Sequence, residues 1–414
     1  MYGLLGEHLP HSFSPQIHAL LGDYEYGLFE VAPDGLEQFM RAHNFDGINV
    51  TIPYKKAVMK YLDCISPEAE KIGSVNTVTV RDGKLYGDNT DYFGFLYMIK
   101  KSGIEITGKK CLVLGSGGAS LTVVAVLRDL NAKEIVIISR KGENNYENIN
   151  VHSDAQIIVN TTPVGMYPNN LESAIDINLF PNLDGVLDIV YNPLKTKLIL
   201  DAEDRGIPSA AGLSMLVAQA KRANEIFFGI SRPDSVCEKI EKTLKTEFQN
   251  IILVGMAGCG KSTVGNALAK FLGKKFTDTD EMIVQNEGIS IPEIFEKHGE
   301  DYFRVCETDA VKSVSKEKGL VIATGGGVVT REENFYPLRQ NGIVVFINRD
   351  VEKLPTNGRP LSQQQGVKAL FEKRLHLYRR FAHIEIDGNG TMQETAELIA
   401  KELEKYEDPR YQRS

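Results

Sequence analysis

The stretch Ile251–Thr263, IILVGMAGCGKST, constrains the fold of this chain more than any other part of it. A short apolar run predicts a strand, a glycine-rich turn follows, and Lys261-Ser262-Thr263 opens a helical pattern. The spacing Gly255-x-x-x-x-Gly260-Lys261-Ser262 is typical of a phosphate-binding loop. Glycines leave backbone N–H groups free to face a phosphate, and the helix N-terminus adds positive potential. Together these features favour a site for ATP or GTP over a turn that is glycine-rich by chance.

Composition narrows the class of protein. The chain has 414 residues, enough for two or three domains, and a formal net charge of −8. Without a basic excess a nucleic-acid partner is not expected. The five cysteines show no metal-ligand spacing. No secretory signal and no apolar run of about 20 residues is present, so we expect a cytoplasmic protein without a membrane span.

The first 240 residues alternate short apolar runs with helical patterns, which predicts an α/β fold. The strands and helices that we expect in this part are strands 2–5, 27–31, 47–50, 76–80, 85–86, 110–114, 134–138, 156–159 and 185–190, and helices 15–21, 213–228 and 233–246. An Asp82-Gly83 turn between the fourth and fifth strands predicts a hairpin and hence some antiparallel pairing.

Three polar clusters lie at the ends of these strands. They are HSFSP from residue 11, GINVTIPYK from residue 47 and GDNTD from residue 87. Any one of them alone is best explained as turn chemistry. Because ligands bind at the carboxyl edge of open α/β sheets, their joint occurrence predicts a binding site there.

A second glycine loop, GSGGAS from Gly115, lies between a predicted strand and an apolar helix, and another strand follows. This order is that of a dinucleotide-binding unit. The second strand ends at Ser139-Arg140-Lys141 rather than at an acidic residue. Cations at this position suit the 2′-phosphate of NADP, although a solvated basic turn is the alternative.

These motifs occur in one order with VNT, NTTPVGM, DIVYNP and GLSMLVAQA, and residues 1–245 together resemble shikimate dehydrogenase. That family reduces 3-dehydroshikimate to shikimate with NADPH. The resemblance implies that Lys55 and Asp91 are the catalytic pair. It further implies substrate contacts from Ser12, Ser14, Thr51, Lys55, Asn76, Asp91, Tyr191 and Gln219, and cofactor contacts from Gly115, Gly117, Gly118, Ala119, Ser120, Arg140 and Gly212.

The chain departs from this family between Arg140 and Asp154, where the segment is shorter than usual. We therefore expect one helix–strand pair of the cofactor domain to be trimmed or lost.

After the phosphate loop the chain carries FTDTDE, YFR, ATGGG, RPL and Arg374-x-x-Leu-Tyr, a set that resembles shikimate kinase over residues 250–390. The resemblance implies that Asp280 deprotonates the attacking hydroxyl and that Arg359, in the lid, meets the transferring phosphoryl group. It implies ATP contacts from Gly255, Gly258, Cys259, Gly260, Lys261, Ser262, Thr263 and Arg359, Mg²⁺ contacts from Ser262 and Asp278, and shikimate contacts from Asp280, Arg304, Gly326, Gly327 and Arg374. The lid segment before Arg359 is shorter than usual.

The two implied reactions are consecutive, because the first half of the chain would make shikimate, the acceptor that the second half would phosphorylate. We expect a bifunctional enzyme with a dehydrogenase substrate domain over 1–90 and 212–245, an NADP-binding Rossmann-like domain over 91–211, a polar linker over 242–250 and a P-loop kinase domain with a parallel sheet over 250–414. One alternative is a non-catalytic shikimate or quinate sensor, and another is a chain with only one active half. Use of quinate beside shikimate stays open.

Overall fold

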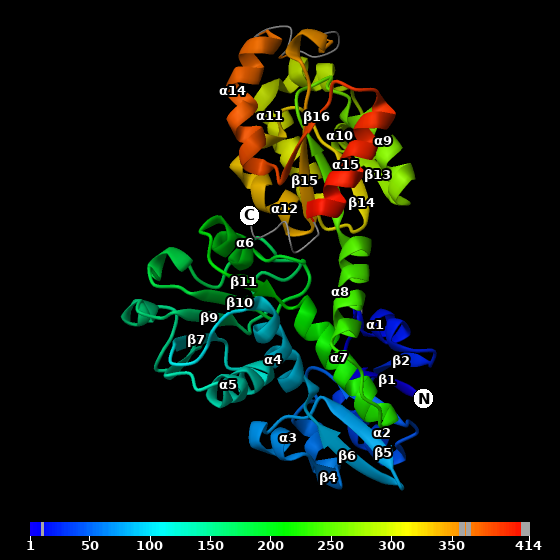
Figure 1. The fold of residues 1–414 in the computed structure, drawn as a ribbon, viewed down its shortest axis with the longest axis vertical. Helices are drawn as coiled ribbons and strands as arrows, with labels where there is room; N and C mark the ends of the chain where they lie inside the picture. The colour runs from blue at the N-terminus through cyan, green and yellow to red at the C-terminus, as the bar shows by residue number, and fades with distance from the viewer. Residues whose placement is uncertain (10–11, 356–360, 362–365, 407–414) are drawn as a thin grey trace. The chain divides into compact units, whose positions relative to one another are not determined.

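The computed structural model describes residues 1–9, 12–355, 361 and 366–406. The chain divides into two compact units, Met1–Leu244 and Lys245–Ser414. The helices and strands of each unit are labelled in Figure 1.

The first unit begins with a mixed six-stranded sheet in the order β2-β1-β3-β5-β6-β4. Its strands are β1 Tyr2–Gly6, β2 Tyr26–Glu30, β3 Gly47–Val50, β4 Cys64–Ile65, β5 Thr77–Arg81 and β6 Lys84–Asp88, and its helices are α1 Ser14–Leu21, α2 Leu36–Ala42 and α3 Pro67–Ile72. β5 and β6 form the expected antiparallel hairpin. Its turn places Asp82 and Gly83 at φ 52° and 73°, the left-handed region that a tight hairpin turn demands.

A second sheet in this unit is entirely parallel, in the order β11-β10-β9-β7-β8. Its strands are β7 Lys110–Leu114, β8 Glu134–Ile138, β9 Ile157–Asn160, β10 Gly185–Asp188 and β11 Ser209–Ala211, flanked by α5 Gly118–Asp129 and α6 Lys197–Asp204. Alternate residues of β7 point to opposite faces, so Cys111 and Val113 enter one core cluster and Leu112 and Leu114 the other.

The trimmed cofactor domain is confirmed by this sheet. A dinucleotide-binding sheet usually runs 3-2-1-4-5-6, with a further strand beyond the second. Here β8 lies at the edge, and residues 139–156 contain only a short 3₁₀ turn, Ile149–His152, instead of a helix–strand pair. The edge is therefore left open beside Arg140.

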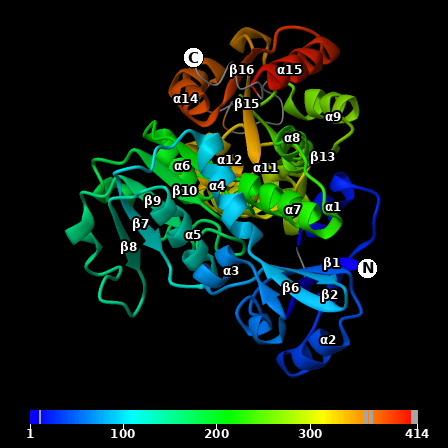
Figure 2. The same cartoon turned by 60° about the horizontal axis from the view of Figure 1, so that its bottom comes forward.

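Helix α4, Thr90–Ser102, packs along α7, Leu213–Phe228, and joins the two sheets of the first unit (Figure 2). A Cβ on Gly94 would lie 2.6 Å from the Met215 carbonyl oxygen, so the close approach of these helices requires glycine. Phe95 and Met98 of α4 are fully buried beside Met215. α4 thereby connects the carboxyl end of β6 in the mixed sheet to the start of β7 in the parallel sheet.

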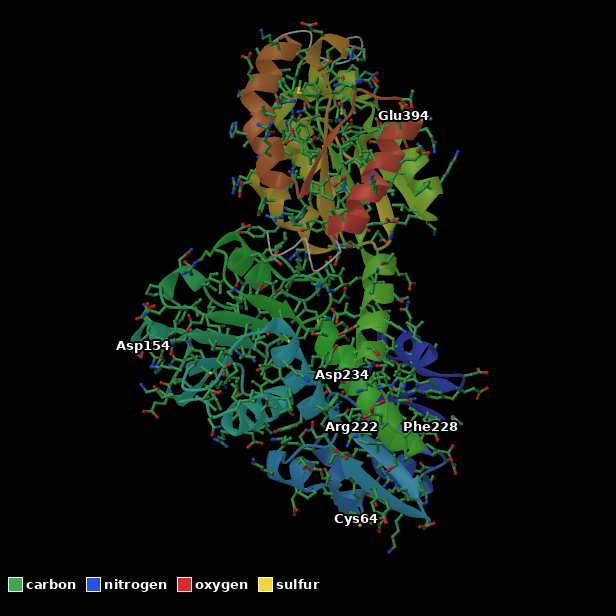
Figure 3. The ribbon with its side chains drawn as sticks, viewed as in Figure 1. Cys64, Asp154, Arg222, Phe228, Asp234 and Glu394 are labelled. Atoms are coloured by element: carbon green, nitrogen blue, oxygen red, sulfur yellow. The ribbon has the colours of Figure 1, made fainter. Side chains whose placement is uncertain are left out.

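The division between the two units, after Leu244, lies within the linker expected over 242–250. This segment is helical, because residues up to Phe248 belong to helix α8, Ser235–Phe248. Polar residues separate Leu244 from Phe248, but these two recur at a helical spacing of four and are both buried. The start of α8 is fixed to α7 by an ion pair of 2.9 Å between Lys221 Nζ and Asp234 Oδ1, and Figure 3 shows Asp234 there.

The second unit is a parallel sheet in the order β13-β14-β12-β15-β16. Its strands are β12 Asn250–Val254, β13 Lys275–Asp278, β14 Leu320–Ala323, β15 Gly342–Asn348 and β16 Ile384–Asp387, and its helices are α9 Lys261–Leu272, α10 Thr279–Glu287, α11 Ile291–Val314, α12 Phe335–Gln340, α14 Val367–Phe381 and α15 Met392–Tyr406. α9 and α15 pack together on one side of the sheet, and α11 and α14 lie on the other (Figure 1). β12 is central and buried throughout, which places the loop after it at the middle of the carboxyl edge.

Most expected elements of residues 1–250 lie within two residues of those observed. Among the described residues, no helix combines the length and apolar character needed to cross a bilayer.

Candidate active sites

Lys55 and Asp91 lie together in the first unit although 36 residues separate them. Lys55 Nζ donates to Asp91 Oδ2 at 2.5 Å, and their side chains are 21% and 12% exposed. Asp91 stands in the first turn of α4, whose N-cap Asn89 accepts a hydrogen bond from the Tyr92 N–H. An ammonium group held by a carboxylate in a half-buried position is suited to donating a proton to a developing alkoxide.

A buried hydrogen-bond network connects two predicted substrate residues to this pair. Asn76 Oδ1 accepts from the backbone N–H of Thr90 at 2.7 Å, and the Thr90 hydroxyl donates to Gln219 Oε1 at 3.3 Å. Gln219 Nε2 in turn donates to the Leu216 carbonyl at 3.0 Å. Asn76 and Gln219 therefore meet at Thr90, the residue directly before Asp91.

The remaining predicted substrate residues come from separate loops. Ser12 Oγ accepts from the Ser14 N–H at 3.2 Å. The ring of Phe13 lies 5.4 Å from that of Tyr191, which brings the loop after β10 to the serine loop. Thr51 is half-buried at the end of β3, and its N–H bonds the Leu5 carbonyl at 2.9 Å. Burial raises the pKa of the Tyr191 hydroxyl, which keeps it a neutral donor.

Asn49, Thr90 and Tyr26 are not among the predicted site residues, although they lie in the same hydrogen-bonded region. Tyr26 donates to Asn49 Oδ1 at 2.7 Å, and Asn49 Nδ2 donates to Thr77 Oγ1 at 3.1 Å. Asn49 and Thr90 lie inside motifs already recognised, GINVTIPYK and GDNTD, the first on strand β3 and the second at the start of helix α4, and membership of these motifs was the available signal. Tyr26 carries no such signal.

The glycine loop after β7 has the shape that a dinucleotide phosphate needs. Gly115 has φ 104°, and a Cβ there would lie 2.9 Å from Thr161 Oγ1. Gly117 and Gly118 face open space at the N-terminus of α5. Ser120 is buried and its hydroxyl bonds the Gly117 carbonyl at 2.6 Å, so it shapes the loop from inside. Ala119 follows in the first turn of α5. These residues fit a pyrophosphate.

Arg140 is exposed directly after β8, at the open sheet edge. Gly212 has a structural reason to be glycine, because a Cβ there would overlap the Ile189 carbonyl. Its N–H bonds the Val190 carbonyl at 2.9 Å. The cofactor roles of both residues stay predictions.

Asp188, at the end of β10, is the first residue of the motif DIVYNP; it is buried and is not among the predicted site residues. It accepts from Thr196 Oγ1 at 2.6 Å, from Asn160 Nδ2 at 3.0 Å and from the Val190 N–H at 3.0 Å. Burial raises the pKa of its carboxyl group to about 7. These bonds fasten the loops after β9 and β10 to each other.

In the second unit, the phosphate loop wraps the side chain of Lys261. Lys261 Nζ donates to the carbonyls of Gly255 and Met256, both at 2.9 Å, which holds it at the centre of the loop. Gly258 and Gly260 have φ 86° and 102°, values that turn successive N–H groups inward. Cys259 is buried, with its sulfur 3.9 Å from Lys261 Nζ.

Ser262 and Asp278 are joined across the carboxyl edge. Ser262 Oγ donates to Asp278 Oδ2 at 2.6 Å, while Asp278 Oδ1 accepts from the Asp280 N–H at 2.9 Å. A hydroxyl and a carboxylate beside a phosphate loop are hard oxygen donors, as Mg²⁺ requires. Within the described residues no cluster of three acidic, histidine or cysteine side chains could hold a metal ion alone. The pair therefore fits a Mg²⁺ whose other ligands come from phosphates and water.

Asp280 has the environment of a general base. Its Oδ1 is buried and has no hydrogen-bond partner. Burial, and then the neighbouring carboxylates Asp278 and Glu307, raise its pKa to about 7. A base with a pKa near the operating pH transfers protons most effectively.

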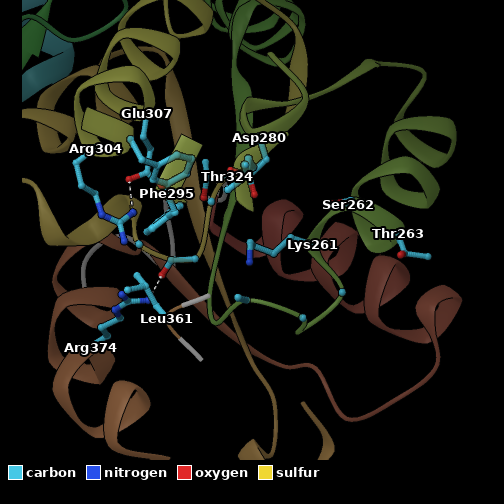
Figure 4. Close-up of a pocket in the computed structure, with 18 residues that line it drawn as sticks. Lys261, Ser262, Thr263, Asp280, Phe295, Arg304, Glu307, Thr324, Leu361 and Arg374 are labelled. Atoms are coloured by element: carbon cyan, nitrogen blue, oxygen red, sulfur yellow. Dashed lines mark hydrogen bonds and ion pairs between the residues drawn. The ribbon is translucent and has the colours of Figure 1, made fainter. Parts of the chain in front are cut away.

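Two arginines face a cavity of about 460 Å³ that also contains Lys261 and Asp280 (Figure 4). Arg304 comes from α11, and its Nη1 donates to Glu307 Oε2 at 2.7 Å. Arg374 comes from α14, and its Nη1 donates to the Gly326 carbonyl at 3.1 Å. Two guanidinium groups on one wall suit a carboxylate ligand.

Glu307 was not recognised in the sequence, although it lies three residues after Arg304 on the same helix. Its side chain is completely buried, and burial raises its pKa. It holds Arg304 in place against the cavity wall.

The glycines of ATGGG are required by crowding. A Cβ on Gly325 would overlap Glu307 Oε1, and one on Gly327 would overlap the Arg304 guanidinium. A Cβ on Gly326 would lie 2.6 Å from the Ala257 nitrogen, in the phosphate loop. Arg359, the predicted lid residue, lies outside the described residues. Thr263 lines the cavity at the start of α9.

Comparison with known proteins matches a family model to each of the two units. Residues 4–78 match the model of the shikimate dehydrogenase substrate binding domain, and residues 257–404 match that of shikimate kinase. A Clostridium perfringens shikimate dehydrogenase (NADP(+)) is 41% identical over 269 residues, which cover 60% of this chain and 99% of the relative. The chain belongs to the shikimate dehydrogenase family. It also carries a shikimate kinase domain.

Solved structures of the family match the first part of the chain. A chorismate mutase/shikimate 5-dehydrogenase fusion from Clostridium acetobutylicum has TM-score 0.56 and 38% identity over 59% of this chain and 96% of its own. A Thermus thermophilus shikimate 5-dehydrogenase, in complex with NADP(H) and shikimate, has TM-score 0.54 and 32% identity over 58% of this chain and 98% of its own.

Proposed function

We propose that this chain reduces 3-dehydroshikimate to shikimate with NADPH and then phosphorylates shikimate at its 3-hydroxyl with ATP and Mg²⁺. The dehydrogenase would use residues 1–90 and 212–245 for substrate and 91–211 for NADP, and the kinase would use 250–414. The observation that carries the proposal is the presence of both reactive constellations in one chain: Lys55 bonded to Asp91, and Asp280 unpaired beside Arg304.

In the first reaction NADPH supplies the hydride to the ketone carbon. The protein's part is to place a proton at the ketone oxygen, and Lys55 Nζ is suited to donate it because Asp91 fixes its position. Asn76 and Gln219, both anchored at Thr90, would orient the ring hydroxyls. The hydroxyls of Ser12 and Ser14 would receive the substrate carboxylate.

In the second reaction ATP with Mg²⁺ supplies the phosphoryl group. Arg304 and Arg374 would clamp the carboxylate of shikimate. Asp280 would hold the attacking hydroxyl and take its proton. Lys261 and the phosphate-loop N–H groups would neutralise the phosphate charge that develops during transfer.

The sensor alternative predicts damaged catalytic positions, whereas both sets of residues are present. Two variants test the proposal: Lys55→Ala should abolish only the reduction, and Asp280→Asn only the phosphorylation, each measured with purified substrate. Wild-type protein that binds shikimate but turns over neither substrate would favour a sensor. Loss of both activities in one variant would show that the sites depend on each other. We also propose a cytoplasmic location, in keeping with the small-molecule substrates.

A further inference from the structure

Arg349 follows β15 directly and stands at the edge of the sheet where the phosphate loop lies. β15 pairs in parallel with β12, with Phe346 opposite Val254. Residues just beyond the two strands therefore emerge side by side at the carboxyl edge, where open α/β sheets bind ligands. Arg349 is not among the residues predicted for either site.

The side chain of Arg349 reaches the phosphate loop itself. Its Nη1 lies 3.7 Å from the position that a Cβ on Gly260 would occupy. On its other side, a Cβ on Gly388 would lie 3.5 Å from Arg349 Cβ. Arg349 therefore lies between the phosphate loop and the connection from β16 to α15.

This guanidinium has no anion in the described part of the chain. Its Nε is buried and makes no hydrogen bond. Two neighbouring carboxylates have other partners. Asp350 pairs with Lys353 at 3.1 Å, and Glu385 pairs with Arg379 at 3.0 Å. A buried donor without a partner is rare in folded proteins, and a bound anion would supply the counter-charge that this guanidinium lacks among the described residues.

Resting on the kinase function proposed above, we propose that Arg349 binds the phosphate chain of ATP. A guanidinium fork matches phosphate oxygens, and here it lies beside Gly260 in a loop of the phosphate-binding pattern. The acceptor is assigned to Arg304 and Arg374, which line the cavity beside Asp280, whereas Arg349 lies against Gly260 of the phosphate loop. Arg349 would thus add a second, side-chain contact to the nucleotide that the backbone cradle already holds.

The test uses the full-length chain with Arg349→Ala, and Lys353→Ala as a matched control that removes a nearby exposed cation. Loss of a hydrogen bond to a charged group raises a dissociation constant by about 10- to 100-fold. We expect this rise in the KM for ATP, in the Kd of ADP measured by calorimetry, and in the inhibition constant of inorganic tripolyphosphate. The KM for shikimate and the reductase activity should stay at wild-type values, and Arg349→Lys should recover part of the loss.

Affinity for ADP within about twofold of wild type, a difference that corresponds to only about 0.4 kcal/mol, would overturn the proposal. So would a loss for ADP with unchanged tripolyphosphate inhibition, which would place Arg349 on the nucleoside. A wild-type protein that binds ADP through Arg349 but does not phosphorylate shikimate would instead refute the kinase function and leave this inference standing.

Discussion

Replacing Asp280 by asparagine should inactivate the kinase and stabilise its fold. Asp280 is held at a pKa of about 7 against a usual 3.8, mainly because its carboxyl group is buried. In the unfolded chain that carboxyl ionises freely, so at pH 8 the folded state carries the cost of a desolvated charge. The contribution of Asp280 to stability is present below about pH 4 and is lost as the pH rises to about 7.

The size of the effect follows from the pKa difference. Each unit corresponds to about 1.4 kcal/mol, so a difference of about three units sets a ceiling of about 4 kcal/mol. Asp280 keeps part of its surface in contact with solvent. We therefore expect the substitution to raise the free energy of unfolding by about half of that ceiling. About 2 kcal/mol would raise the Tm of a unit of this size by about 4 to 8 °C at pH 8.

Scanning calorimetry of the full chain measures this rise, and the kinase transition is the one that ATP with Mg²⁺ shifts upward. Asp309→Asn, an exposed change on α11, is the matched control. The gain in Asp280→Asn should be smaller at pH 5 than at pH 8. No gain at pH 8, or an equal gain at both pH values, would refute the desolvated-carboxylate explanation.

Three further predictions concern the independence of the sites. Lys55→Ala should lower reductase turnover by at least about 10²-fold, the lower range for a general acid, with kinase kinetics unchanged. Gly327→Ala should raise the KM for shikimate in the kinase assay, because its Cβ would displace the Arg304 guanidinium, while calorimetric binding of ADP stays at the wild-type level; an unchanged KM would contradict the crowding. Removing Mg²⁺ with a chelator should stop phosphorylation and leave NADPH oxidation intact, and an equal loss of both would argue against separate sites.

Features formed by one continuous segment were predictable from the sequence, whereas features formed by residues far apart in the chain were harder to predict. The phosphate loop is a continuous segment whose shape is set by its own glycines, and it was predictable from Gly255 to Thr263. The bond between Lys55 and Asp91 joins two motifs through the pairing of β3, β5 and β6, which spacing alone does not disclose.

The features that the sequence missed owe their roles to burial. Glu307 reads as one acidic residue among many on a helix, and only the fold shows that it is fully buried against Arg304. The same holds for Asp188 beneath two loops. The segment over 242–248 read as a polar linker because just two apolar residues, Leu244 and Phe248, secure that part of α8.

The central claim is that one chain carries out both reactions in succession. The most direct measurement supplies 3-dehydroshikimate, NADPH, ATP and Mg²⁺ to the purified protein and identifies the products by mass. We predict shikimate 3-phosphate, with shikimate accumulating when ATP is omitted and no product when NADPH is omitted. Shikimate alone in the complete mixture, or no reduction at all, would contradict the claim.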